Sequence, residues 1–370
     1  MVGSVSVLCG QMLVVGLEGR RLGEAERNAF AAGERGGTVL FRRNVGAGLD
    51  GLREVAELID AVRDAAGTDY PPLVAVDQEG GRVMRLGPPA MQLPPMRKMG
   101  DLDDRALVVR VAEAQAKELA ALGFTMSFAP IADVHTHADN PIIGDRAFAT
   151  TPEKVAAFAG AWAEGLARGG ILSCAKHFPG HGDTTVDSHL ALPTVTRPRD
   201  QLDRIEIAAF RPLARDPNVA SMMTAHVVYP AFDAKLPATL SSAVCTDLLR
   251  RELGFEGVLF SDDLEMKAIE IPVGEAAVRA VLAGCDVLLV CSRPDLVDEA
   301  FAGLVHEAEK SAAFRARCEE AVARHLTMRR KVRPAPTTDA AALERVFAAT
   351  APVADELAAR LASHAESTRA

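Results

Sequence analysis

The sequence lacks the features that mark a disulfide-rich or zinc-knuckle protein. Its six cysteines include no CxxC pair, and several of them stand inside apolar runs. Disulfide scaffolds and structural zinc sites both need cysteines at characteristic spacings. We therefore expect buried, reduced thiols.

A basic excess and long apolar stretches are also missing. The 41 basic residues are outnumbered by 50 acidic ones, which gives a formal net charge of −9. A nucleic-acid or anionic-membrane surface needs an excess of Lys and Arg, and a membrane-spanning helix needs about 20 apolar residues in a row. The N-terminus has no basic region before Arg20, so no secretory signal is expected. We predict a cytoplasmic protein with no nucleic-acid or membrane partner.

What the sequence does contain is a regular alternation of short apolar runs and longer segments with helical spacing. Strands that alternate with helices form βαβ units and a parallel sheet. The predicted strands are 12–17, 38–41, 73–76, 126–131, 171–176, 220–225, 258–261 and 286–290. The predicted helices are 49–66, 104–122, 152–168, 200–214, 242–253 and 274–283.

Eight strands over this length predict an α/β fold, a single-domain (β/α)8 TIM-type barrel. A doubly wound open sheet is the alternative, but the sequence carries neither of the glycine-rich phosphate-binding fingerprints that would support it. We expect the barrel domain to span residues 1–333. The composition then changes, and we expect residues 334–370 to form a helical tail packed on the barrel.

Polar residues follow five of the predicted strands directly. In a barrel the carboxyl ends of the strands carry the active site, so these positions coincide with the expected site. They are Asp77, Asp133, Lys176, His177, His226, Asp262 and Asp263.

The stretch KHFPGHGDTTVDSHLALP, residues 176–193, carries three His and two Asp in a loop rich in Gly and Pro. Loops on a rigid scaffold commonly hold functional residues. Asp187 and His189 could form a dyad in which the carboxylate orients the ring and raises its basicity. The alternative is a polar loop that only satisfies its own hydrogen bonds.

Three further stretches add candidate residues. In GFEGVLFSDDLEM, Asp262 or Asp263 could be a nucleophile or a metal ligand, or could simply cap a following helix. VAVDQEGGRVMRL places Asp77 before a tight Gly-Gly turn and two arginines. The long connection at 127–148 contains His135 and His137, which we expect at the surface rather than as ligands.

Taken together, KHFPGHG with DSH, AVDQEGGRV, FAPIADV, GDRAF and GFEGVLFSDDLEM resemble the family 3 glycoside hydrolases. The resemblance covers residues 9–332 and is closest to the bacterial β-N-acetylglucosaminidases of peptidoglycan recycling. It implies a retaining hydrolase without cofactor or metal, acting on an N-acetylglucosamine-containing glycan or muropeptide. It assigns Asp262 as nucleophile and His189, with Asp187, as acid/base. It assigns sugar binding to Asp77, Arg85, Arg146, Lys176 and His177.

Other functions stay open on the sequence alone. A His acid/base would also suit phosphorolysis, because it would not repel an incoming phosphate as a carboxylate would. A metal-dependent barrel hydrolase could draw ligands from His177, His181, His189, Asp183 or Asp262. A catalytically silent sugar-binding barrel is disfavoured, since the candidate nucleophile and the dyad are both present.

Overall fold

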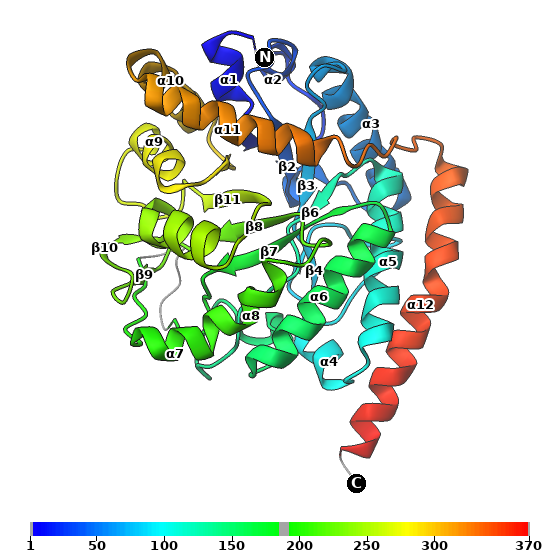
Figure 1. Cartoon of the computed structure of the whole chain (residues 1–370). Coiled ribbons are helices and arrows are strands. Elements are labelled where there is room, and N and C mark those ends of the chain that lie inside the picture. The colour runs from blue at the N-terminus through cyan, green and yellow to red at the C-terminus, as the bar shows by residue number, and fades with distance from the viewer. Residues whose placement is uncertain (1–2, 185–191, 369–370) are drawn as a thin grey trace.

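The computed structural model describes residues 3–184 and 192–368. Its centre is a closed barrel of eight parallel strands (Figure 1). Every predicted strand is found, so the (β/α)8 barrel is confirmed and the open sheet is wrong. In order around the barrel the strands are β1 (Leu13–Gly16), β2 (Gly37–Leu40), β3 (Leu73–Val76), β6 (Met126–Ser127), β7 (Leu172–Phe178), β8 (Ser221–Thr224), β11 (Val258–Asp263) and β12 (Val287–Val290), which pairs back onto β1.

Helices surround the barrel (Figure 1). The predicted ones correspond to α3 (Gly48–Ala66), α5 (Arg105–Leu122), α6 (Pro152–Arg168), α7 (Arg199–Arg204) with α8 (Glu206–Leu213), the π-helix η4 (Ala243–Glu252) and α9 (Val273–Ala283). The helix expected over 200–214 is broken at Ile205, whose backbone leaves the helical region. The helices that the sequence reading did not single out are α1 (Val5–Gly10), α2 (Glu24–Ala31), α4 (Met96–Asp101), α10 (Pro294–Lys310) and α11 (Ala312–Arg329).

The barrel interior is packed, which confines open space to one end. Alternate residues of the strands point inward, as the two-residue period of a strand requires. Phe128 and Phe260 meet edge to face there, with ring centroids 5.5 Å apart. Met223 and Leu289 belong to the same interior cluster. Phe128, Met223 and Leu289 also line the pocket above, so this core is the floor of the site.

A short hairpin beyond β3 brings the DQEGGRV motif back over the barrel. Its strands are β4 (Gln78–Gly80) and β5 (Val83–Met84). Gly80 and Gly81 make the turn with φ of 141° and 58°, a region that favours glycine. A Cβ on Gly80 would lie 2.6 Å from the carbonyl oxygen of Pro94. A second hairpin is formed by β9 (Val228–Tyr229) and β10 (Asp233–Pro237), and the 3₁₀ turns are η1 (Arg42–Asn44), η2 (Gly144–Arg146) and η3 (Ala238–Leu240).

The C-terminal segment ends in a long helix, α12 (Ala340–Ser367), which packs mainly against α5 (red in Figure 1). The contact includes a buried carboxyl group: Glu118 accepts hydrogen bonds from the Thr350 hydroxyl at 2.5 Å and the Met91 amide at 2.8 Å. Burial raises the pKa of Glu118. The division into a barrel domain at 1–333 and a tail at 334–370 stays a prediction.

The composition predicted reduced cysteines and no membrane-spanning helix. All six cysteines are buried, as expected, and the structure places none of them in a disulfide. Across residues 3–184 and 192–368, no helix has both the length and the apolarity to cross a membrane.

Candidate active site

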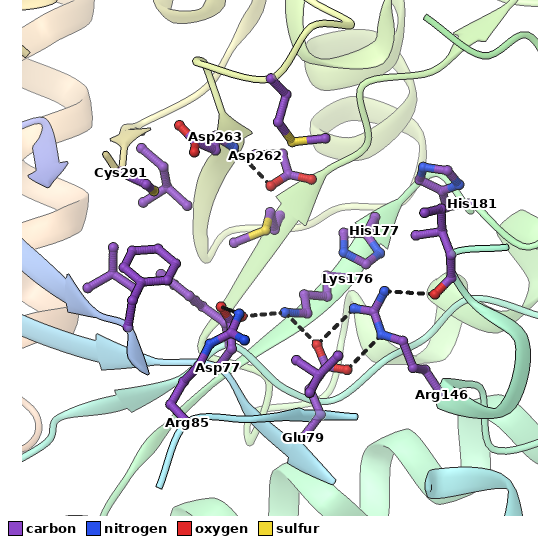
Figure 2. A pocket seen from close by; sticks show the side chains of 18 residues that line it. Asp77, Glu79, Arg85, Arg146, Lys176, His177, His181, Asp262, Asp263 and Cys291 are labelled. Atoms are coloured by element: carbon purple, nitrogen blue, oxygen red, sulfur yellow. Dashed lines mark hydrogen bonds and ion pairs between the residues drawn. The ribbon is translucent and has the colours of Figure 1, made fainter. Parts of the chain in front are cut away.

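A pocket of about 280 Å³ opens at the carboxyl ends of the barrel strands. Figure 2 shows that side chains from several distant parts of the chain converge on it. The polar groups at the carboxyl ends of β3, β7 and β11 therefore meet, as the barrel predicts, whereas Asp133 and His226 are not among the lining residues. The charged and titratable side chains of the lining are Asp77, Glu79, Arg85, Arg146, Lys176, His177, His181, Asp262 and Asp263.

One wall of the pocket is a continuous chain of ion pairs (Figure 2). Lys176 Nζ lies 2.8 Å from both Asp77 Oδ1 and Glu79 Oε1. Arg146 Nε and Nη2 donate two hydrogen bonds of 2.9 Å to the Glu79 carboxylate. Arg85 Nη2 donates to Asp77 Oδ2 at 2.9 Å. Four sugar-binding residues implied by the resemblance thus lie in one network.

Glu79 is the member of this wall that the sequence did not identify as a candidate site residue. Its side chain is only 1% exposed, and it is the one carboxylate that contacts both Arg146 and Lys176 in the described structure. Glu79 stands two residues after Asp77, and alternate residues of an extended segment share a face. That spacing, together with the Gly-Gly turn that follows it, was the signal available in the sequence.

Each charge in this wall is maintained by its neighbours. Burial favours the neutral acids, but Lys176 and Arg85 hold the pKa of Asp77 well below its usual range. Arg146 and Lys176 do the same for Glu79. In turn, the carboxylates hold the pKa values of Arg146 and Lys176 above their usual range despite burial. The wall therefore presents fixed charges, with N–H donors and carboxylate lone pairs that suit vicinal hydroxyl groups.

Asp133 holds His177 and His181, at and just beyond the end of β7, from behind the pocket. It is fully buried and accepts from His177 Nδ1 at 2.8 Å and from the His181 amide at 2.6 Å. Because a carboxylate only accepts hydrogen bonds, Nδ1 of His177 carries a proton. Asp133 thus occupies Nδ1, and Nε2 is the remaining nitrogen of the His177 ring, which lines the pocket. Burial and the charge of His177 lower the pKa of His181 to about 4, so its ring is neutral near pH 7.

Asp262 and Asp263 end β11 with opposite electrostatic environments. Burial favours neutral Asp262, but His226 and His177 and the Asp263 amide, which donates to Asp262 Oδ1 at 2.8 Å, hold its pKa below the usual range. Burial, helped by the charges of Glu265 and Asp262, raises the pKa of Asp263 to about 7. Asp262 is therefore the ionised member of the pair, which is the state a nucleophile needs.

The carboxyl group of Asp263 is turned toward Cys291 and away from Asp262 (Figure 2). With Asp263 neutral, the three cationic side chains of the described lining balance its three remaining carboxylates. Neither aspartate caps a helix, because α9 begins only at Val273, after Pro272. The capping alternative for this pair is therefore wrong.

The other candidate residues from the sequence are not among the lining residues of the pocket that the structure describes. Asp187 and His189 fall outside the described residues, so their predicted roles stay predictions. His135 Nδ1 lies 3.0 Å from Arg97, and neither His135 nor His137 lines the pocket. In the part of the chain that the structure describes, no group of three or more His, Cys, Asp or Glu side chains could hold a metal ion.

The chain is similar to known proteins along most of its length. The family model described as the glycosyl hydrolase family 3 N-terminal domain matches residues 4–328. A beta-hexosaminidase of Neisseria meningitidis serogroup C is 42% identical over 289 residues, 75% of this chain and 77% of that protein. One from Neisseria gonorrhoeae is 43% identical over 288 residues, with the same coverage.

Solved structures show the same similarity in three dimensions. A glycoside hydrolase family 3 β-N-acetylglucosaminidase from a Paenibacillus species superposes with a TM-score of 0.84 at 35% identity, covering 95% of this chain and 69% of that one. NagZ from Neisseria gonorrhoeae in complex with N-trifluoroacetyl-D-glucosamine gives a TM-score of 0.75 at 33% identity, covering 93% and 98%.

The ion-pair wall predicts a large stability cost for Glu79→Gln. The amide would leave Arg146 and Lys176 buried with one carboxylate fewer, and removing one partner of a buried ion pair costs about 3–5 kcal/mol. The control is Glu57→Gln, which breaks an exposed pair with Arg53 and should cost under about 1 kcal/mol. Urea unfolding of both variants measures the difference, and equal losses would show that Glu79 does not anchor the wall.

The environment of Asp263 predicts that the difference in stability between the wild type and Asp263→Asn changes with pH. An unfolded aspartate ionises near pH 4, whereas folded Asp263 ionises near 7. Between these values ionisation favours the unfolded chain, so this residue makes the wild type lose stability as the pH rises from 4 to 7. Asparagine cannot ionise, so the variant's stability relative to wild type should grow over that interval. A difference that is constant from pH 4 to pH 7 in urea titrations would refute the assignment of a neutral Asp263.

Proposed function

The chain belongs to glycosyl hydrolase family 3, and we propose that it is a retaining β-N-acetylglucosaminidase that releases terminal non-reducing N-acetylglucosamine from peptidoglycan fragments. That it is a glycoside hydrolase of the β-hexosaminidase type follows from its relatives. The observation that carries the finer proposal is the pairing, in one pocket, of an ionised Asp262 with a wall of fixed hydrogen-bonding groups. Retaining hydrolysis requires a carboxylate nucleophile below the anomeric carbon and an acid near the leaving oxygen, and Asp262 facing this pocket supplies the first of the two.

In the proposed first step, a carboxylate oxygen of Asp262 attacks the anomeric carbon. A carbon–oxygen bond to the enzyme forms, the glycosidic bond breaks, and the leaving oxygen takes a proton from His189. The low pKa of Asp262 supports this role, because the carboxylate is ionised at neutral pH. A glycosyl–Asp262 ester results.

In the second step, water attacks the anomeric carbon of the ester while His189 accepts a proton from the water, and Asp262 leaves as a carboxylate. A histidine suits both directions of proton transfer because its ordinary pKa of about 6.5 is close to neutrality. Asp187 would fix the ring tautomer and stabilise the imidazolium. Both assignments rest on the KHFPGHG and DSH motifs of this sequence.

The sugar ring is held by Asp77, Arg85, Arg146, Lys176 and His177 in this proposal. Both oxygens of Asp77 already accept one hydrogen bond each, from Lys176 and Arg85. Each keeps further lone-pair capacity, so the carboxylate can accept from two neighbouring hydroxyls. Lys176 has two of its three N–H groups on carboxylates and one left for a sugar oxygen.

We also propose a substrate class and a location. NagZ from Neisseria gonorrhoeae was solved with N-trifluoroacetyl-D-glucosamine, which supports an N-acetylglucosamine unit in the equivalent pocket. We place the enzyme in the cytoplasm, where its six free thiols would stay reduced. No cofactor is required by the proposed steps.

The substrate and the reaction type can be tested in one assay. Purified protein should cleave an aryl N-acetyl-β-glucosaminide much faster than the matching aryl β-glucoside. It should yield free N-acetylglucosamine both with and without inorganic phosphate, and it should keep its activity after chelator treatment. Formation of the sugar 1-phosphate would instead support the phosphorylase, and loss on chelation with recovery on zinc would support the metal-dependent hydrolase.

The proton donor can be tested through the leaving group. Protonation helps most when the leaving alkoxide is poor, and general acid catalysis contributes a factor of about 10² to 10⁴. His189→Ala should therefore lower kcat/KM for a disaccharide far more than for an aryl glycoside with an acidic phenol. Asp187→Ala should show the same pattern more weakly. Equal losses on the two substrates would mean that His189 acts through binding or folding.

A further inference from the structure

Behind the nucleophile lies a buried polar cluster to which the proposed steps give no role. It consists of Thr224 at the end of β8, His226 two residues later, and Thr239 in η3. All three side chains are 0% exposed, and none lines the pocket. Buried polar groups are normally hydrogen-bonded, and the partners of these three connect β8 to β11.

The contacts run from Thr224 toward the end of β11. Thr224 Oγ1 and Thr239 Oγ1 are 2.8 Å apart. Thr239 Oγ1 lies 2.6 Å from His226 Nδ1, and His226 Nε2 lies 2.9 Å from the main-chain oxygen of Asp263. A connected series of four groups thus links β8 to the residue that follows the nucleophile.

The protonation of this series follows from its last member. A main-chain carbonyl can only accept, so His226 Nε2 carries a hydrogen. The Thr239 hydroxyl can then donate to Nδ1 at 2.6 Å rather than to the Ala225 carbonyl, which is farther away at 3.3 Å. If the ring becomes charged, Nδ1 donates to Thr239, and the hydroxyl hydrogen can turn to Ala225. Thr239 therefore serves the ring in both states.

The main chain of Asp263 is the point where this series meets the site. Its carbonyl accepts from His226, while its amide donates to Asp262 Oδ1 at 2.8 Å. On the other side of the strand, the Leu264 amide donates to the Leu289 carbonyl at 3.0 Å. The turn that carries the nucleophile is thus fixed by β12 on one side and by His226 on the other.

We propose that Thr239 is a positioning residue that acts through His226 on the main chain of Asp263 and so holds the Asp262 carboxylate in line for attack. The inference rests on the proposed role of Asp262 as nucleophile. A positioning group of this kind affects the rate because a displacement of about 1 Å at the reacting atom can cost a factor of about 10².

The test is Thr239→Val, which removes the hydroxyl at nearly constant volume. Expected is a loss of at least about tenfold in kcat/KM on an aryl N-acetyl-β-glucosaminide, with little change in KM; tenfold corresponds to about 1.4 kcal/mol. Thr239→Ser keeps the hydroxyl and should restore the rate to within about threefold. If the valine variant does not fold, Thr239→Ala removes the same hydroxyl and should show the same loss.

The matched control is Thr38→Val on β2, from which β11 is separated by β1 and β12. Thr38 is equally buried, and its hydroxyl donates to the Val15 carbonyl at 2.7 Å. Removing this hydroxyl leaves a similar buried group unsatisfied, so the control should lose comparable stability in urea but stay within about twofold of wild type in kcat/KM.

A spectroscopic readout separates positioning from a general loss of packing. The ¹⁵N shifts of the His226 ring report which nitrogen carries the proton, and they should change in Thr239→Val but not in Thr38→Val. Wild-type kcat/KM or unchanged ring shifts in Thr239→Val would overturn the inference. A wild type that is inactive on the substrate would instead refute the proposed function itself.

Discussion

The carboxylate of Glu79 is almost completely removed from water, and it stays ionised only because Arg146 and Lys176 both contact it. Much of the pocket depends on this triple contact. Lys176 extends it to Asp77, and Asp77 extends it to Arg85. Residues of β4, η2 and β7 and the residues directly after β3 and β5 therefore share one set of charges. A site with this many buried charges is stable only as a complete network, because each carboxylate lowers the cost of burying its cations.

On the other side of the pocket, two neighbouring aspartates have very different pKa values. Asp262 and Asp263 are adjacent in sequence, yet the nearby His226 and His177 side chains and an amide hold the pKa of the first below its usual range, while burial and nearby negative charge keep the second protonated up to about pH 7. Environments that push the pKa values of neighbouring acids apart are how one site assigns different chemical roles to identical side chains. Only one of the two acids then carries the charge that the proposed nucleophile needs, and the main-chain amide of the other donates a hydrogen bond to it.

The sequence predicted the barrel well because each strand is a short apolar run bounded by polar residues, and a barrel places such polar residues at one end. Asp77, Lys176 and Asp262 could be located by that rule alone. Glu79 could not, because it lies on a hairpin beyond the strand and its partners are distant in sequence. The break at Ile205 and the bonds from Thr239 to His226 depend on tertiary packing, which local spacing does not encode. Asp187 and His189 lie outside the described residues, so they stay predictions.

In the proposed mechanism Asp262, rather than its neighbour, forms the covalent bond to the sugar. The most direct measurement is mass spectrometry of peptides after wild-type protein has reacted with a fluorinated N-acetylglucosamine donor that forms the intermediate faster than it hydrolyses. We expect a single added glycosyl group, carried on Asp262 and absent from Asp262→Ala. A label on Asp263, or no label despite turnover, would show that Asp262 is not the nucleophile.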